Sequence, residues 1–171
     1  EGYSQETMEK IAAKYAKQAK NINQTRSANM ADNTVIMILS ETFSDPTRVP
    51  GVSFSEDPMP NIRQLKTQTT SGLMLSPGYG GGTANIEYQA LTGLSMANYS
   101  STLSIAYQQL VPSLKWAPSL NQAWNAANGK DASVALHAYN RNMYFRDVNY
   151  KKFAFSKFYA ADSEPKLKDL Q

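Results

Sequence analysis

Four glycines occupy the five positions 78–82 in the stretch SPGYGGGTANIEYQALTGLSM, directly before Thr83. Glycine costs about 0.5–1 kcal/mol of conformational entropy relative to alanine, so such a run indicates a backbone that turns tightly or lets another group approach closely. The apolar residues that follow Thr83 have the spacing of an amphipathic helix. The run therefore predicts a tight loop that ends at the N-terminus of a helix, with Thr83 at that end.

Strand and helix patterns alternate along the rest of the chain. Val35–Leu39 is a short continuous apolar run, typical of a strand that is buried on both faces, and residues 69–77 and 132–139 are further strand candidates. Helical patterns cover residues 61–68, 84–94 and 119–129, with Gly129 at the C-terminal end, and residues 142–153 form an aromatic-rich helix or turn. This alternation predicts an α/β fold with a largely parallel sheet flanked by helices.

The N-terminal region differs from this pattern. Residues 4–22 have apolar side chains at helical spacing, and the following residues 23–33 are polar and aperiodic. The region is also basic, with Lys10, Lys14, Lys17, Lys20 and Arg26. These charges fit attraction to an anionic surface such as lipid headgroups, but a solvated helix face explains them as well. We expect a helix and linker that precede the main domain.

Composition excludes several classes of protein. The 171 residues are 42% hydrophobic and 18% charged, which is enough apolar mass for a core, and no apolar run reaches about 18 residues. Cysteine is absent, which excludes disulfides, thiolate metal sites and a cysteine nucleophile. The chain begins Glu-Gly-Tyr, so we expect it to be a portion of a longer protein.

Three known motifs are excluded or disfavoured by the residues present. The glycine run lacks the lysine of a phosphate-binding P-loop, and Thr83 stands where a dinucleotide-binding loop needs its third glycine. Ser44–Arg48, SDPTR, matches the five-residue pattern in which sulfatases form formylglycine. It directly follows a predicted strand, whereas that nucleophile should open a later helix, so we interpret it as a loop.

Three polar residues follow the predicted strands. Glu41 comes after the first, Thr83 after the second, and His137 ends the third. Because ligands of open α/β sheets bind beyond the carboxyl ends of the strands, these side chains are expected at one rim. Thr83 could act as a nucleophile if a base or a cation held by Glu41 activates it. It could also simply cap its helix, and the pattern alone favours the cap.

The blocks SETFSDP, GGGTANIEYQALTGLSM and HAYNRNMYFRDVNYKKF, in that order, resemble the lipoteichoic-acid-synthase-like branch of the sulfatase and alkaline phosphatase superfamily. These are membrane-anchored phosphoglycerol transferases of Gram-positive bacteria whose catalytic domains lie outside the cell. The resemblance covers roughly residues 33–160. It implies that residues 1–32 lead from a membrane region and that residues 33–171 are the N-terminal portion of a truncated sulfatase-like catalytic domain.

The resemblance also implies a site. Glu41 and Thr83 would bind a divalent metal, usually Mn²⁺ with Mg²⁺ as an alternative, and Thr83 would attack the phosphorus of phosphatidylglycerol. His137, Tyr144 and Arg146 fall at positions that hold the glycerophosphate group. Each of these three residues also has a structural alternative. Arg146 could equally form a surface salt bridge with Asp147. His137 could have a structural role at the end of its strand, and Tyr144 could pack in the core. Tyr139 stands where the family has an acid, which is a departure from its pattern.

The family completes its metal site with an Asp-His pair that this chain lacks. We therefore expect the chain alone to be inactive, to bind manganese weakly and to self-associate through uncovered core surface. The implied acceptor is a glycolipid or a teichoic acid chain, with no nucleic-acid partner. Alternatives are a phosphodiesterase or sulfatase-like hydrolase, a phosphoethanolamine-type transferase, and a non-catalytic glycerophosphate-binding homologue.

Overall fold

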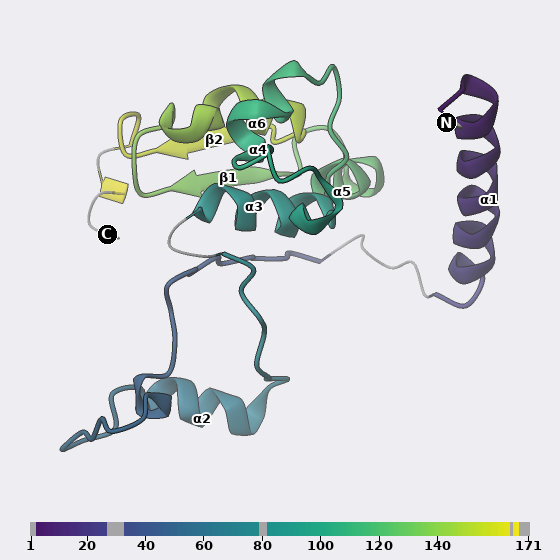
Figure 1. Cartoon of the computed structure of the whole chain (residues 1–171). Coiled ribbons are helices and arrows are strands. Elements are labelled where there is room, and N and C mark those ends of the chain that lie inside the picture. Colours follow the sequence, from purple (N-terminus) through teal and green to yellow (C-terminus); the bar gives the residue numbers. More distant parts are fainter. Residues whose placement is uncertain (1–2, 27–32, 79–81, 165, 168–171) are drawn as a thin grey trace. The chain divides into compact units, whose positions relative to one another are not determined.

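The computed structural model describes residues 3–26, 33–78, 82–164 and 166–167 (Figure 1). The chain divides into two units, Glu1–Val35 and Ile36–Gln171. The first unit contains α1 (Gln5–Asn23), which the sequence predicted at residues 4–22. The Ser4 side chain accepts a hydrogen bond from the Thr7 backbone N–H and so caps the helix. No residue of α1 is buried.

The second unit contains a two-stranded parallel sheet. β1 (Val134–His137) pairs with β2 (Lys157–Ala160), in register from Val134 opposite Lys157 to His137 opposite Ala160. The connection between them contains the 3₁₀ turn η4 (Met143–Phe145) and α6 (Arg146–Lys152), as a parallel pair requires a crossover. The structure thus confirms the predicted strand at 132–139 and the helix or turn at 142–153, and it adds β2.

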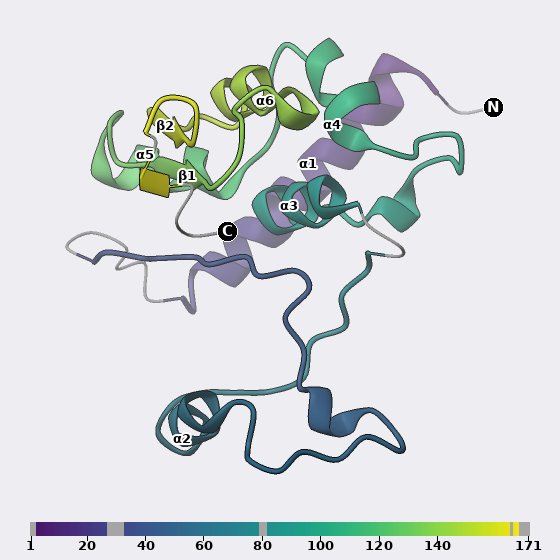
Figure 2. The same cartoon turned by 90° about the vertical axis from the view of Figure 1, so that its left-hand side faces the viewer.

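Helices pack beside these strands (Figures 1 and 2). They are α3 (Thr83–Thr92), α4 (Ala106–Gln109) and α5 (Leu120–Asn128), with the 3₁₀ turns η2 (Met96–Asn98) and η3 (Val111–Ser113) between them. Helices α3 and α5 confirm the predictions at 84–94 and 119–129. The buried cluster combines aromatic and small side chains: Ala84, Tyr88, Ala106, Tyr107, Val111, Ala117, Ala135, Tyr150 and Phe153.

A separate stretch contains η1 (Pro46–Arg48) and α2 (Pro60–Gln68), which matches the helix predicted at 61–68. Proline begins both elements, where its missing N–H costs nothing. None of the helices that the structure describes is long and apolar enough to cross a membrane.

Two predicted strands, Val35–Leu39 and 69–77, are not strands in the structure. The sheet of the described residues contains β1 and β2 only. A strand needs a neighbour to pair its backbone N–H and C=O groups, and neither segment has one here. Their apolar side chains are correspondingly exposed, with Ile38 at 83% and Leu75 at 89%. The apolar pattern is real, but no strand of the described residues pairs with either segment.

We expect the 171-residue chain, expressed alone, to self-associate through these apolar segments, because exposed apolar runs without partners associate in water. Light scattering coupled to size-exclusion chromatography should show a mass that rises with concentration. The substitutions Ile38→Lys and Leu75→Lys should lower it. A wild-type chain that remains monomeric at all concentrations would contradict this expectation.

Candidate active site

Thr83 opens α3, and its hydroxyl is directed at a carboxylate from a distant part of the chain. Gly82 precedes it in the left-handed conformation, with φ of 91°, which glycine adopts without strain. The Thr83 Oγ1 donates a hydrogen bond of 2.6 Å to Oε2 of Glu41, 42 residues earlier. Both side chains are half-buried. The structure therefore brings together the two residues that the sequence placed at the ends of its first two predicted strands.

The alternative that Thr83 caps its helix is wrong in this structure. The N-cap position belongs to Gly82, and α3 has no side-chain capping hydrogen bond. A capping threonine accepts a bond from a backbone N–H, whereas the Thr83 hydroxyl donates to Glu41. The hydroxyl is thus committed to the carboxylate and not to the helix.

Gly78 shows why the loop before α3 contains glycine. A Cβ at this position would lie 2.6 Å from Cδ1 of Ile86 and 3.4 Å from Oε1 of Glu41. The first distance is a clash, so any side chain at 78 would displace Ile86, which is buried on α3. Gly78 therefore lets the loop pass close to both α3 and the Glu41 carboxylate. Gly80 and Gly81 lie outside the described residues.

The oxygen donors of Glu41 and Thr83 fit a hard divalent cation such as Mn²⁺ or Mg²⁺. They make only part of a site, because such cations take about six oxygen ligands. Within the part of the chain that the structure describes, no group of three or more His, Cys, Asp or Glu residues is placed to hold a metal ion. The remaining ligands of such an ion would therefore have to come from outside any such cluster of the described residues.

Arg146 is buried in an ion pair with Glu87 of α3. Its Nη2 lies 2.6 Å from Oε1 of Glu87, and its Nε lies 3.0 Å from Oε2. The Arg146 side chain is only 2% exposed, and the Glu87 side chain is 11% exposed. The alternative of a surface salt bridge with Asp147 is therefore wrong: the partner is Glu87, and the pair is internal. The predicted contact of Arg146 with phosphate stays a prediction.

Tyr144 lies against the Arg146 guanidinium, with 5.4 Å between the guanidinium carbon and the ring centroid. Tyr144 and Phe145 both have positive φ, 55° and 56°, a conformation that is costly for residues other than glycine. The buried Asn149 side chain donates a hydrogen bond to the Tyr144 carbonyl and so holds this turn. Tyr144 also packs against the buried cluster, as core packing predicted. Its predicted contact with glycerophosphate is not tested by these contacts.

His137 ends β1 and is half-buried. Burial lowers its pKa from the ordinary 6.5, the positive charge of Arg146 lowers it further, and Glu87 opposes the shift. His137 therefore lies within the field of the Arg146–Glu87 pair. Tyr139, the residue that departs from the family pattern, lies just beyond β1 and is 47% exposed. Its carbonyl accepts a hydrogen bond from the Ala161 N–H.

We expect the imidazole of His137 to titrate below pH 6.5. Above this pH the folded and unfolded chains both hold it neutral, so its contribution to stability is fully present. As the pH falls, the unfolded chain takes up the proton first, and the free energy of unfolding decreases. Because His137 is the single histidine, NMR titration of one imidazole signal measures the pKa directly. A value at or above 6.5 would be contrary to this environment.

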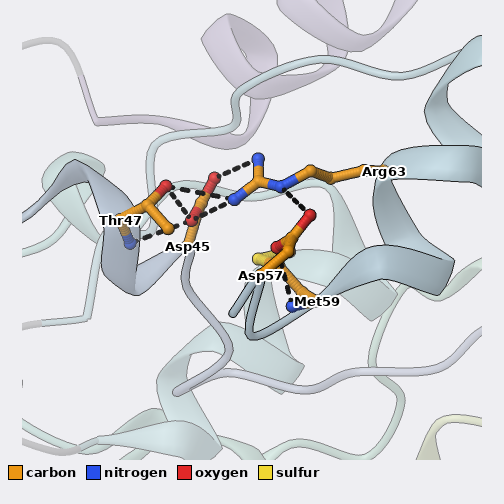
Figure 3. A network of polar contacts seen from close by, with 5 residues as sticks. All are labelled: Asp45, Thr47, Asp57, Met59 and Arg63. Carbon is orange, nitrogen blue, oxygen red and sulfur yellow. Dashed lines mark hydrogen bonds and ion pairs between the residues drawn. The ribbon is translucent and has the colours of Figure 1, made fainter. Parts of the chain in front are cut away.

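Sequence reasoning missed a second polar network, which Figure 3 shows. The Arg63 guanidinium of α2 contacts Asp45 with Nη1 at 3.0 Å and Asp57 with Nε at 2.7 Å. Asp45 also accepts a hydrogen bond from Thr47 Oγ1, and the Thr47 and Arg63 contacts lower its pKa to about 2. This network fixes the SDPTR stretch as a loop with one 3₁₀ turn, in agreement with its interpretation as a loop.

Comparison with known proteins shows which family the chain belongs to. Residues 33–168 match the Sulfatase family. The solved structure of "Streptococcus pyogenes phosphoglycerol transferase GacH in complex with sn-glycerol-1-phosphate" is similar, with a TM-score of 0.79 and 43% identity, over 93% of this chain and 41% of that one. A curated relative from Rhizobium meliloti (strain 1021), described as "Putative cyclic beta-1,2-glucan modification protein", is 38% identical over 133 residues.

This alignment with the Rhizobium protein covers 78% of the present chain and 19% of the relative. The chain thus spans less than half the length of either protein. The likeness to the solved structure confirms the α/β, sulfatase-like fold that the sequence predicted. The match over 33–168 includes Glu41, Thr83 and Arg146. The chain belongs to the sulfatase family.

Proposed function

We propose that this chain forms part of the catalytic domain of a metal-dependent phosphoglycerol transferase, with Thr83 as its nucleophile. The observation that carries the proposal is the hydrogen bond from Thr83 Oγ1 to Glu41 Oε2 at the start of α3. The likeness to a phosphoglycerol transferase solved with sn-glycerol-1-phosphate supports the donor group. Phosphatidylglycerol is a membrane lipid, and we propose, as the family resemblance implies, that the reaction takes place at the extracellular face of the cell membrane.

In the proposed reaction the Thr83 oxygen attacks the phosphorus of phosphatidylglycerol. The bond from phosphorus to the diacylglycerol oxygen breaks, and diacylglycerol leaves with a proton. An acceptor hydroxyl then attacks the phospho-threonine, the bond between phosphorus and Thr83 breaks, and the hydroxyl of Thr83 regains a proton. Donor and acceptor are thereby converted to diacylglycerol and a glycerophosphorylated acceptor.

The residues of the site have distinct tasks in this scheme. Glu41 orients the Thr83 hydroxyl, and the N-terminus of α3 carries a partial positive charge of roughly +0.5 that favours the lipid phosphate and the developing oxyanion. A divalent cation held by Glu41 and Thr83 would lower the pKa of the hydroxyl and offset charge on the phosphoryl oxygens. Arg146, His137 and Tyr144 would hold the glycerophosphate group.

The acceptor is proposed to be a saccharide hydroxyl. The implied glycolipid acceptor carries such hydroxyls, and the Rhizobium relative is by its description a modifier of a cyclic glucan. A lipoteichoic acid chain, whose polymer end is a glycerol hydroxyl, is the second acceptor that the resemblance implies.

A transfer assay separates the proposal from its rivals. The full-length protein that contains this chain, with Mn²⁺, is given phosphatidylglycerol labelled in its headgroup, together with a cyclic β-1,2-glucan or a glycolipid. We expect diacylglycerol release and a labelled saccharide. Free labelled glycerol phosphate without labelled saccharide would indicate a hydrolase instead. In a parallel reaction with phosphatidylethanolamine as the donor, consumption of this lipid but not of phosphatidylglycerol would indicate the phosphoethanolamine-type enzyme. Binding of phosphatidylglycerol without release would indicate a non-catalytic homologue.

A further inference from the structure

Glu87 lies on α3 four residues after Thr83, and its carboxylate is occupied by a residue from a different part of the chain. Residues four apart on a helix lie on the same face, just over one turn from each other. Arg146, 59 residues beyond Glu87, contacts both carboxylate oxygens. One face of α3 therefore carries the proposed nucleophile Thr83 and, one turn further along, the carboxylate that binds the buried Arg146 guanidinium.

We propose that Glu87 is a positioning residue of the active site, which holds the Arg146 guanidinium and the turn before it at a fixed distance from Thr83. The proposal rests on the proposed function, in which Arg146 binds the phosphate of the glycerophosphate group. Glu87 itself does not contact substrate in this account. It acts through Arg146.

The hydrogen bonds of Arg146 show which of its N–H groups are used by other residues of the chain. A guanidinium has five N–H groups in one rigid plane. Glu87 takes the Nε–H and one N–H of Nη2, and the Met143 carbonyl takes one N–H of Nη1 at 3.0 Å. In the part of the chain that the structure describes, one N–H of Nη1 and one of Nη2 donate to no carboxylate or carbonyl, and in this proposal they receive the anion. Because the plane is rigid, the three contacts that are made fix the direction of these two.

The Glu87 carboxylate is in turn held in place. The Tyr150 hydroxyl of α6 donates to its Oε2 at 2.9 Å. Burial raises the pKa of Tyr150, so this hydroxyl stays protonated and remains a donor. The ring of Tyr144 lies against the guanidinium, on a turn in which the Tyr144 carbonyl accepts a hydrogen bond from Asn149.

A buried ion pair is a poor source of stability, because desolvation of the two charges offsets much of their attraction. Its physical contribution here is geometric. The pair connects α3 to the segment 143–150, in which Tyr144 and Phe145 have the left-handed backbone conformation that is costly for residues other than glycine. An apolar contact could also hold α3 and the segment 143–150 together, but it would not orient the N–H groups of Arg146.

The test is a double-mutant cycle on ligand binding. Calorimetry measures the Kd of sn-glycerol-1-phosphate, with Mn²⁺ present, for the full-length protein and for Glu87→Gln, Arg146→Gln and the double variant. We expect Glu87→Gln to raise the Kd by roughly tenfold, as for loss of a hydrogen bond to a charged group. In the Arg146→Gln background the same change should add no further weakening, because Glu87 acts through Arg146. Glu56→Gln, an exposed carboxylate, is the matched control.

Two further readouts keep the outcomes separate. A merely structural Glu87 would lower the melting temperature and leave the Kd of the folded protein unchanged, and that result overturns the positioning role alone. If the wild-type protein neither binds the ligand nor releases diacylglycerol, the proposed function falls and the positioning role with it. Should Glu87→Gln not fold, Tyr150→Phe decides: we expect a smaller weakening of binding in the same direction, and an unchanged Kd overturns the proposal.

Discussion

Replacing Thr83 with alanine is expected to lower kcat for glycerophosphate transfer by about a thousandfold or more, because removal of a covalent nucleophile leaves only binding and electrostatic assistance. The fold should barely change. The substitution removes one half-buried hydrogen bond to Glu41, which contributes about 0.5–1.5 kcal/mol to stability. Single-turnover release of diacylglycerol by the full-length protein measures the effect.

Thr83→Ser is the matched control for this substitution. It keeps a hydroxyl that reaches Glu41 and loses only a methyl group, so it should retain a substantial part of the activity. If the alanine variant turns over as fast as the wild type, Thr83 is not the nucleophile. Equal loss in the serine and alanine variants would instead trace the defect to packing at the start of α3.

The second large effect is expected from Glu87→Ala, which should lower the free energy of unfolding by about 3–5 kcal/mol. The variant leaves the Arg146 charge with 2% exposure and without its carboxylate partner. It also removes the acceptor of the Tyr150 hydroxyl. Urea unfolding of the chain, followed by circular dichroism at a concentration where light scattering shows a monomer, measures the change.

The double replacement Glu87→Met with Arg146→Met is the control for the ion pair. Without either charge no uncompensated group is buried, so the double variant should be more stable than Glu87→Ala. A loss below about 1 kcal/mol in Glu87→Ala would contradict the view that the charge of Arg146 depends on Glu87 in the folded chain.

The contact between Glu41 and Thr83 is the part of the candidate site that could be predicted from the sequence. Both residues follow apolar runs, and the sequence predicted them side by side across 42 residues, although the two runs are not strands in the structure. Local patterns likewise predicted α1, α2, α3, α5 and β1, because capping residues and apolar spacing act within a few residues. The catalytic roles of these residues remain predictions.

Long-range partners account for what the sequence did not predict. Val35–Leu39 has a strand pattern, but strand formation depends on a neighbouring strand that no local pattern reveals. For Arg146 the sequence offered its neighbour Asp147 as an alternative to a phosphate ligand, whereas its ion-pair partner in the structure is Glu87 on α3. The Asp45–Arg63 contact joins residues 18 apart through a loop with no periodicity. For Glu87, its position one turn after Thr83 on the same helix face was the available signal.

The central claim is that the Thr83 oxygen becomes bonded to phosphorus. The most direct measurement is mass spectrometry of peptides from the full-length protein, after incubation with phosphatidylglycerol and Mn²⁺ without acceptor and a rapid acid quench. The account predicts that the peptide containing Thr83 gains the mass of one glycerophosphoryl group, and that this gain is absent in Thr83→Ala. Diacylglycerol release with an unmodified Thr83 peptide, or with the adduct on another residue, would contradict it.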